Sequence, residues 1–165
     1  MKRLGRGAGL AAGLLAIAAV LTACSSNGAL RQAESRLDEL PGVTGSHMWT
    51  SFDGSPTNRS LSARVYVDAD PGEDLGALID AGLETAWSFT GFEPTAGVIF
   101  EVVVGPRPEK PSNSDWDGRV VLEEALPEIG LDEDDIGVLP SFGDVVPVPA
   151  RVMVERYGDW PSSGN

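Results

Sequence analysis

The chain is short of the side chains that build disulfides and metal centres. Its 165 residues include one cysteine and one histidine. A single cysteine cannot form a disulfide within the chain, and a structural zinc site takes four ligands, most of them Cys or His. The composition therefore excludes a structural zinc site, and we expect no cofactor.

Basic residues are also few. The chain has 12 Lys and Arg against 25 Asp and Glu, which gives a formal charge of −13 at pH 7. A surface field of that sign repels phosphate backbones and anionic lipid head groups. We therefore expect no nucleic-acid partner and no adhesion to membranes through a basic patch.

The N-terminal segment has a different composition from the rest. Lys2, Arg3 and Arg6 are followed by an almost wholly apolar run over residues 8–23. A basic start followed by a short apolar run is typical of a secretory signal peptide. The run is too short for the roughly 20 residues that span a bilayer core. We expect residues 1–23 to be a signal peptide.

Four residues at the end of this run carry a family resemblance. Leu21, Thr22, Ala23 and Cys24 resemble the lipobox of bacterial lipoproteins, in which a leucine, a small or hydroxylated residue and an alanine or glycine precede a cysteine. The resemblance implies that the Cys24 thiol receives a diacylglyceryl group and that Cys24 becomes the new N-terminus. Two or more long acyl chains anchor a protein stably. We expect a lipid anchor at Cys24, with the membrane as partner, on the extracytoplasmic face of the cell membrane.

Two other interpretations of the cysteine stay open. It could lie by coincidence in the cleavage site of an ordinary signal peptide, or it could be an unpaired buried thiol. Loss of the leader would remove three basic residues and move the formal charge from −13 to −16. The remaining chain has a length that suits one domain with a single core. We expect a lipidated tether over residues 24–28 and one domain over residues 29–165.

Hydrophobic periodicity predicts an α+β fold. Helical spacing indicates helices over 29–40 and from Pro71 to about 87, the second capped by Asp70 with Glu73 three residues later. Alternating apolar residues indicate strands, and residues 116–128 suit either a helix or a short strand. The order α-β-β-α-β-(α)-β predicts a mainly antiparallel sheet of about four strands with helices on one face. The expected strands cover 43–52, 61–68, 98–104 and 148–154.

The turn from the first helix into the first strand has a weaker resemblance. The residues Glu39-Leu40-Pro41-Gly42-Val43 are similar to the helix-to-strand turn of small ferredoxin-like sheets and of the phospholipid-binding BON domain. These are common turn residues. The resemblance is used here for architecture only.

One face of the predicted sheet carries an unusual mixture of side chains. The strand phases place Tyr, Met and Arg on the face turned away from the helices, and these residue types are enriched in the cores of interfaces. We expect a candidate interaction face for a protein or envelope partner. Alternatively, residues 106–144 or the C-terminal residues fold over this face. The face consists of Arg64, Tyr66, Ile99, Glu101, Arg151, Met153 and Glu155.

Candidate catalytic and metal-binding residues are isolated. His47 would need a nearby hydroxyl such as Ser46, Ser51 or Ser60 to form a nucleophilic site, and no Gly-x-Ser-x-Gly motif is present. The acidic stretch from Asp132 fails the EF-hand pattern because Ile136 replaces an expected ligand. The sequence favours a non-catalytic binding or structural domain. The alternatives are a small extracytoplasmic enzyme and a weak calcium-binding module.

Overall fold

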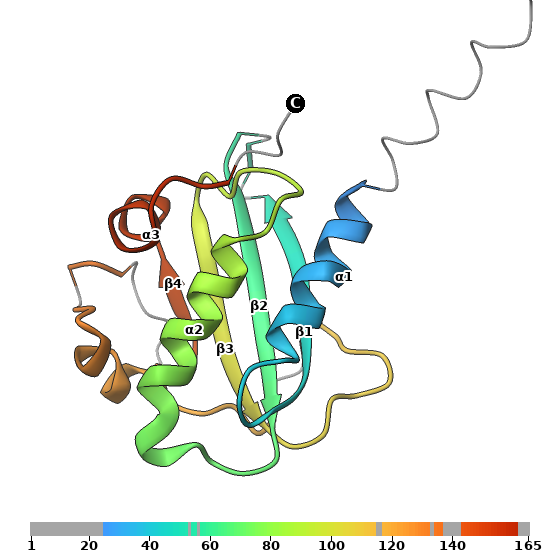
Figure 1. Cartoon of the computed structure of the whole chain (residues 1–165), viewed down its shortest axis with the longest axis vertical. Helices are drawn as coiled ribbons and strands as arrows, with labels where there is room; N and C mark the ends of the chain where they lie inside the picture. The colour runs from blue at the N-terminus through green and yellow to red at the C-terminus, as the bar shows by residue number, and fades with distance from the viewer. Residues whose placement is uncertain are drawn as a thin grey trace, which may run out of the picture.

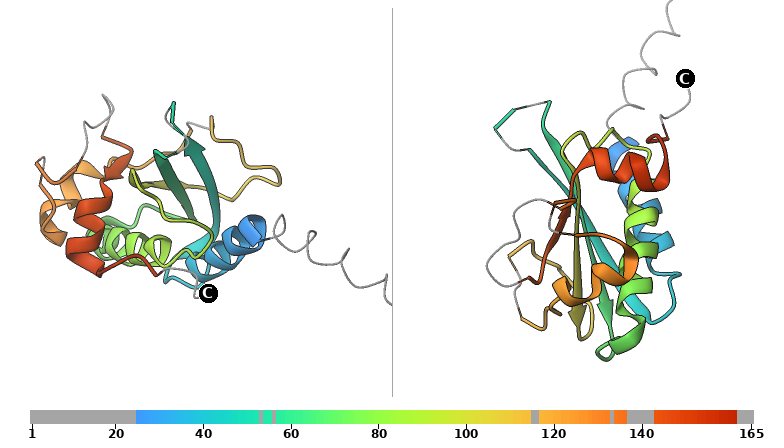
Figure 2. Two further views of the ribbon diagram at one scale, coloured as in Figure 1. Left: turned by 90° about the horizontal axis from the view of Figure 1, so that it is seen from above. Right: turned by 90° about the vertical axis from the view of Figure 1, so that its left-hand side faces the viewer.

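The protein folds as a four-stranded sheet with two helices packed on one of its faces (Figures 1 and 2). The computed structural model describes residues 25–52, 54–55, 57–114, 117–132, 134–136 and 143–161. The predicted signal peptide, the lipobox and Cys24 lie outside the described residues. The predicted α+β fold class is confirmed.

The sheet is mixed. Its strand order is β1-β2-β3-β4, with β1 (Val43–Phe52) antiparallel to β2 (Arg59–Val67). Strand β2 is parallel to β3 (Gly97–Val104), and β3 is antiparallel to β4 (Val146–Val148). Two parallel neighbours need a crossover connection, and the helix α2 (Leu75–Trp87) supplies it. The strands predicted over 43–52, 61–68 and 98–104 correspond to β1, β2 and β3. In β2 and β3, successive side chains lie on the faces of the sheet that the sequence predicted.

Both helix starts differ from the predictions. The first helix, α1 (Ser25–Leu37), begins four residues before the predicted helix, so residues 25–28 of the expected tether belong to it. The Asp70 carboxylate accepts a hydrogen bond from the Gly72 N–H (3.0 Å). This contact leads into a 3₁₀ turn, Gly72–Asp74, and α2 begins only at Leu75. Asp70 therefore stabilises the turn before the helix and does not cap the helix itself.

The core lies between the sheet and the helix layer. Alternate residues of β2 and β3 face α1 and α2, as the two-residue period of a strand requires. Gly82 lies against the Phe100 ring, where a Cβ atom would overlap with the ring. This glycine lets α2 pass close to β3. The buried residues at this contact include Leu61, Ala63, Val65, Leu78, Ile79, Leu83, Val98, Phe100 and Val102.

The prediction of a strand over residues 148–154 is wrong. Strand β4 ends at Val148, and residues Ala150–Tyr157 form a helix, α3. Pro149 is the N-cap of α3, and its carbonyl oxygen accepts hydrogen bonds from the N–H groups of Val152 (3.0 Å) and Met153 (3.1 Å). Alternating residues of this segment do not share one face. Val152 and Met153 are both buried, as on one side of a helix, whereas Val154 is exposed. The ambiguous segment forms two 3₁₀ turns, Glu123–Ala125 and Pro127–Ile129.

Candidate functional site

The predicted interaction face is not an open surface. The side chains of Arg64, Tyr66 and Glu101 are on the face turned away from α1 and α2, but their residues are only 0%, 2% and 4% exposed. The segment after β3 covers them, because the Arg64 Nη1 atom donates a hydrogen bond to the Ser112 carbonyl oxygen (2.8 Å). The second interpretation of this face, in which the chain folds over it, is the one observed.

The other members of the predicted face are elsewhere. Arg151, Met153 and Glu155 belong to α3 and not to a strand of the sheet. Met153 is fully buried in the core beneath α3, and Arg151 donates a hydrogen bond to the Asp134 carbonyl oxygen (2.8 Å). Ile99 is half-buried on β3. The seven residues therefore do not form a common surface.

The covered face holds a buried chain of ion pairs. The Glu101 Oε2 atom lies 2.7 Å from Arg64 Nε and 3.3 Å from Arg119 Nη2. Arg119 continues the chain, with its Nη1 atom 3.4 Å from Asp144 Oδ2. The guanidinium of Arg64 also lies over the Trp49 ring, 5.3 Å from its centroid. This network fastens the residues after β3 to the sheet.

The charge of Arg64 is stabilised by its neighbours. Burial alone would lower the pKa of Arg64, but the hydrogen bond to Glu101 and the nearby Tyr66 oxygen raise it above its ordinary value. A buried arginine that stays charged needs such partners. The network therefore stabilises the packing of the covering segment against the sheet.

His47 does not lie in a nucleophilic site. Its Nδ1 atom is 3.4 Å from Glu34 Oε1, and its ring stacks on Trp49 at 5.2 Å. Ser46 is buried, and its hydroxyl donates to Asp38 Oδ1 (2.6 Å). Successive residues of a strand point to opposite faces, so Ser46 and His47 are directed apart. Both residues join α1 to β1, which is a structural role.

Glu34 is the centre of this α1–β1 contact. Besides the His47 ring, its Oε1 atom accepts a hydrogen bond from the Met48 N–H (2.8 Å). Burial alone would raise the pKa of Glu34, but the contacts with His47 and Met48 lower it below its ordinary value. The carboxylate thereby satisfies a backbone donor at the free edge of β1, a position that otherwise invites pairing with another strand.

No metal centre is visible in the part of the chain that the structure describes. There, no three His, Cys, Asp or Glu side chains come together as metal ligands would. The Asp132 carboxylate accepts hydrogen bonds from the N–H groups of Asp134 (2.9 Å) and Asp135 (3.1 Å). Glu133 lies outside the described residues. The described part of the acidic stretch is thus organised as a turn.

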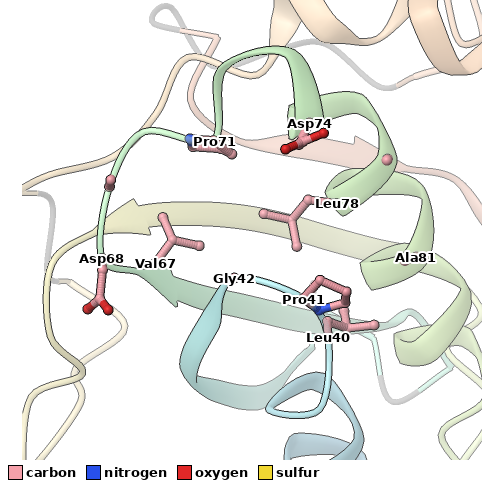
Figure 3. A pocket seen from close by; sticks show the side chains of 11 residues that line it. Leu40, Pro41, Gly42, Val67, Asp68, Pro71, Asp74, Leu78 and Ala81 are labelled. Atoms are coloured by element: carbon pink, nitrogen blue, oxygen red, sulfur yellow. The ribbon is translucent and has the colours of Figure 1, made fainter.

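An apolar groove of about 680 Å³ opens on another part of the described surface. It lies between the α1–β1 turn, the end of β2 and the first turns of α2 (Figure 3). Leu78 of α2 points across it toward Pro41 and Val67, and Asp68 and Asp74 lie at its two sides. The lining consists of Leu40, Pro41, Gly42, Val67, Asp68, Ala69, Pro71, Asp74, Ala77, Leu78 and Ala81.

The electrostatics of the groove are one-sided. Its lining includes two carboxylates and no basic side chain. Asp70 and Glu73 are exposed in the same β2–α2 connection as these two residues, so the segment beside the groove carries four acidic residues. An apolar cleft bordered by carboxylates suits a ligand that has an apolar part and a positive charge.

Sequence reasoning missed this groove. It assigned Pro41 and Gly42 to a helix-to-strand turn, and Asp70 and Glu73 to a helix cap. The signal that could have found it is the apolar turn Leu40-Pro41-Gly42, together with Ala69 and Pro71 in the otherwise acidic turn that lies across the groove from it. Turns on a protein surface are more often polar, and exposed apolar patches often mark binding sites.

The comparisons with known proteins assign no family. No protein-family model, no curated protein and no solved structure matches this chain. Within the described residues, no helix has the length and apolar character needed to cross a membrane.

Proposed function

We propose that the protein is a lipid-anchored extracytoplasmic binding protein. The observation that carries this proposal is the sequence Leu21-Thr22-Ala23-Cys24 at the end of a signal-like segment. Acylation at Cys24 would account for the only cysteine of the chain and would supply an anchor that the acidic domain surface cannot supply.

The groove is the part of the domain that supports a binding role. It would receive the apolar part of a ligand between Pro41, Val67 and Leu78, while Asp68 and Asp74 would attract its positive charge. A binding role is favoured over catalysis because His47 contacts Glu34 and Trp49, while Ser46 is bonded to Asp38. A nucleophilic site needs the hydroxyl and the base in contact.

The anchor is tested by mass and by location. The mature protein should begin at Cys24 and carry the mass of a diacylglyceryl group, measured by mass spectrometry of material purified from membranes. The Cys24→Ser variant should be lost from the membrane fraction. A mature protein with an unmodified thiol, or a variant that still sediments with membranes, would contradict the proposal.

The groove is tested with a matched pair of peptides. The probes are a leucine-rich peptide flanked by lysines and the same peptide flanked by glutamates, each with a fluorescent label, added to protein in uncharged vesicles. Exposed charge pairs contribute about 0.2–1 kcal/mol each, so two of them should favour the lysine peptide several-fold. The double variant Asp68→Asn/Asp74→Asn should reduce this preference.

The control for the peptide experiment changes the same charge elsewhere. Glu93 and Asp159 are exposed and do not line the groove. The variant Glu93→Gln/Asp159→Asn should therefore keep the preference for the lysine peptide. Equal binding of both peptides to the wild-type protein, or equal effects of the two double variants, would rule out the groove as a site for cationic ligands.

A further inference from the structure

We propose that one end of the domain rests on the bilayer, with Phe52 in the membrane interface, and that the groove opens at the opposite end, away from the membrane. This inference rests on the proposed acylation of Cys24. It adds an orientation and a second, weaker contact with lipid to the covalent anchor.

The position of α1 limits how far the domain can lie from the membrane surface. The helix begins at Ser25, the residue bonded to the cysteine that would carry the lipid. Each further residue of extended chain adds at most about 3.6 Å of reach. The start of α1 must therefore stay within a few ångströms of the head groups, and the domain cannot move far from the membrane surface.

The start of α1 lies at a defined end of the domain. Figures 1 and 2 show it at the same end as the β1–β2 hairpin and the last described residues of the chain. Near its other end, α1 is fixed by Arg36, whose Nη1 atom donates to Ser88 Oγ (2.7 Å) just after α2. The N-terminal turns of α1 thus extend beyond the end of α2.

Hydrogen bonds hold this end together as one surface. Arg59 of β2 donates its N–H to Thr95 Oγ1 (3.1 Å), which joins the hairpin to the segment before β3. The indole N–H of Trp160 donates to the Phe89 carbonyl oxygen (2.8 Å), which joins the C-terminal residues to the same segment. The hairpin, residues 88–96 and residues 158–161 therefore move together with the helix layer.

This surface has the composition of a membrane interface. Phe52, at the end of β1, is 61% exposed, more than any other large hydrophobic residue that the structure describes. Arg59 lies 5.6 Å from the centroid of the Phe92 ring, and both Phe92 and Trp160 are half-buried. Aromatic side chains and arginine favour the boundary between head groups and acyl chains. Among the described residues of this end, Glu93 and Asp159 are acidic and exposed, and Asp53, which follows Phe52 in the sequence, lies outside the described residues.

The opposite end has the opposite character. The β2–α2 connection carries four exposed carboxylates, at Asp68, Asp70, Glu73 and Asp74. Anionic lipids repel such a cluster. The groove opens there, between the α1–β1 turn and the start of α2 (Figures 1 and 3). The short distance between Cys24 and α1, the aromatic side chains near the hairpin and the acidic residues near the groove all favour the orientation with the hairpin toward the membrane.

The test measures the depth of single labelled positions. The full-length, acylated protein is reconstituted in vesicles of phosphatidylethanolamine and phosphatidylglycerol. Acylation consumes the only native thiol, so the variants Phe52→Cys and Asp70→Cys each offer one site for an environment-sensitive fluorophore. The position-52 label should shift to shorter wavelengths and be quenched by lipids with a quencher in the acyl chain. The position-70 label should show neither change and should be quenched by aqueous iodide.

A third label controls for exposed apolar positions in general. Val121 is 51% exposed and lies outside the hairpin, so Val121→Cys should behave like Asp70→Cys. Thermal unfolding of each labelled variant shows whether it is folded. If the protein sediments with vesicles but the position-52 label stays in water, or the position-70 label enters lipid, the orientation is wrong. If the unmutated protein takes up the thiol reagent at Cys24, the proposed acylation fails instead.

Discussion

Phe100 and Glu101 are neighbours on β3, and their side chains lie on opposite faces of the sheet. Phe100 is buried in the apolar core beneath α2, where its ring meets Gly82. Glu101 is buried on the other face, where Arg64 and Arg119 approach its Oε2 atom. One face is thus held by apolar burial, and the other by ion pairs under a covering segment.

This difference predicts how substitutions on the two faces of the sheet should change the stability of the fold. Apolar burial is roughly proportional to the area removed from water and does not depend on one partner. A buried ion pair is costly to bring out of water and becomes destabilising when one partner is lost. The helix-covered face should therefore tolerate repacking, whereas the ion-pair face should depend on every member.

Removal of either side chain should have the largest effect. Phe100→Ala should cost about 3–5 kcal/mol of unfolding free energy through the lost burial and the cavity it leaves. Glu101→Ala should cost about 3–5 kcal/mol because two buried guanidinium groups lose a shared carboxylate. Urea unfolding of the purified protein measures both values, and the Glu101 variant should also be cleaved faster by proteases within residues 105–114.

A double variant separates the two mechanisms. In Arg64→Met/Glu101→Ala the unpaired Arg64 charge is gone, so much of the lost stability should return. If Glu101→Ala costs less than about 1 kcal/mol, the ion pairs do not hold the covering segment.

The contrast between the faces also explains what the sequence could predict. The alternation in β2 and β3 gave the apolar face and the phase of Arg64, Tyr66 and Glu101, because strand period is a local property. The alternation did not predict that these residues are covered. Their burial depends on the segment after β3, and residues 105–119 of the sequence have no hydrophobic periodicity. The sequence left this alternative open.

The site was harder to predict than the sheet. The groove forms where two turns pack near α2, and no local sequence pattern indicates that these segments pack together. The error at residues 148–154 has another cause. The segment contains an alternating set, from Val148 to Val154, and also a helical set with i, i+3, i+7 spacing, formed by Ala150, Met153 and Tyr157. Local sequence patterns therefore predict most of the helices and strands, whereas the groove depends on packing between segments that are far apart in the sequence.

A smaller effect is expected at the closest approach within the apolar face. Gly82→Ala improves helix propensity by about 1 kcal/mol but forces the Phe100 ring to move within a packed core, which costs about 1–3 kcal/mol. The net loss should be about 0–2 kcal/mol in urea unfolding. Gly28 on α1 has open space around a Cβ atom, so Gly28→Ala is the matched control and should not destabilise. A stabilised Gly82→Ala variant would mean that the α2–β3 contact is loose.

The smallest effect tests a polar contact outside both buried layers, where α3 meets α2. The Asp80 carboxylate accepts hydrogen bonds from the Tyr157 hydroxyl (2.6 Å) and from Arg156 Nε (2.8 Å). Burial alone would raise the pKa of Asp80, but these two donors lower it below its ordinary value. The side chain is 42% exposed, so solvent screening keeps the contribution below about 1 kcal/mol.

The sign of the pH dependence follows from the lowered pKa. An unfolded aspartate titrates near pH 3.9, so the contribution of Asp80 is complete well above that pH and is lost as the pH falls toward the lower pKa of the folded state. Asp80→Asn should therefore destabilise the protein at pH 7 but have little effect near pH 2, measured by urea unfolding at both values. Glu84→Gln, an exposed position on the same helix, is the control. An equal loss at both pH values would assign the effect to packing of α3, as in the apolar layer, and not to charge.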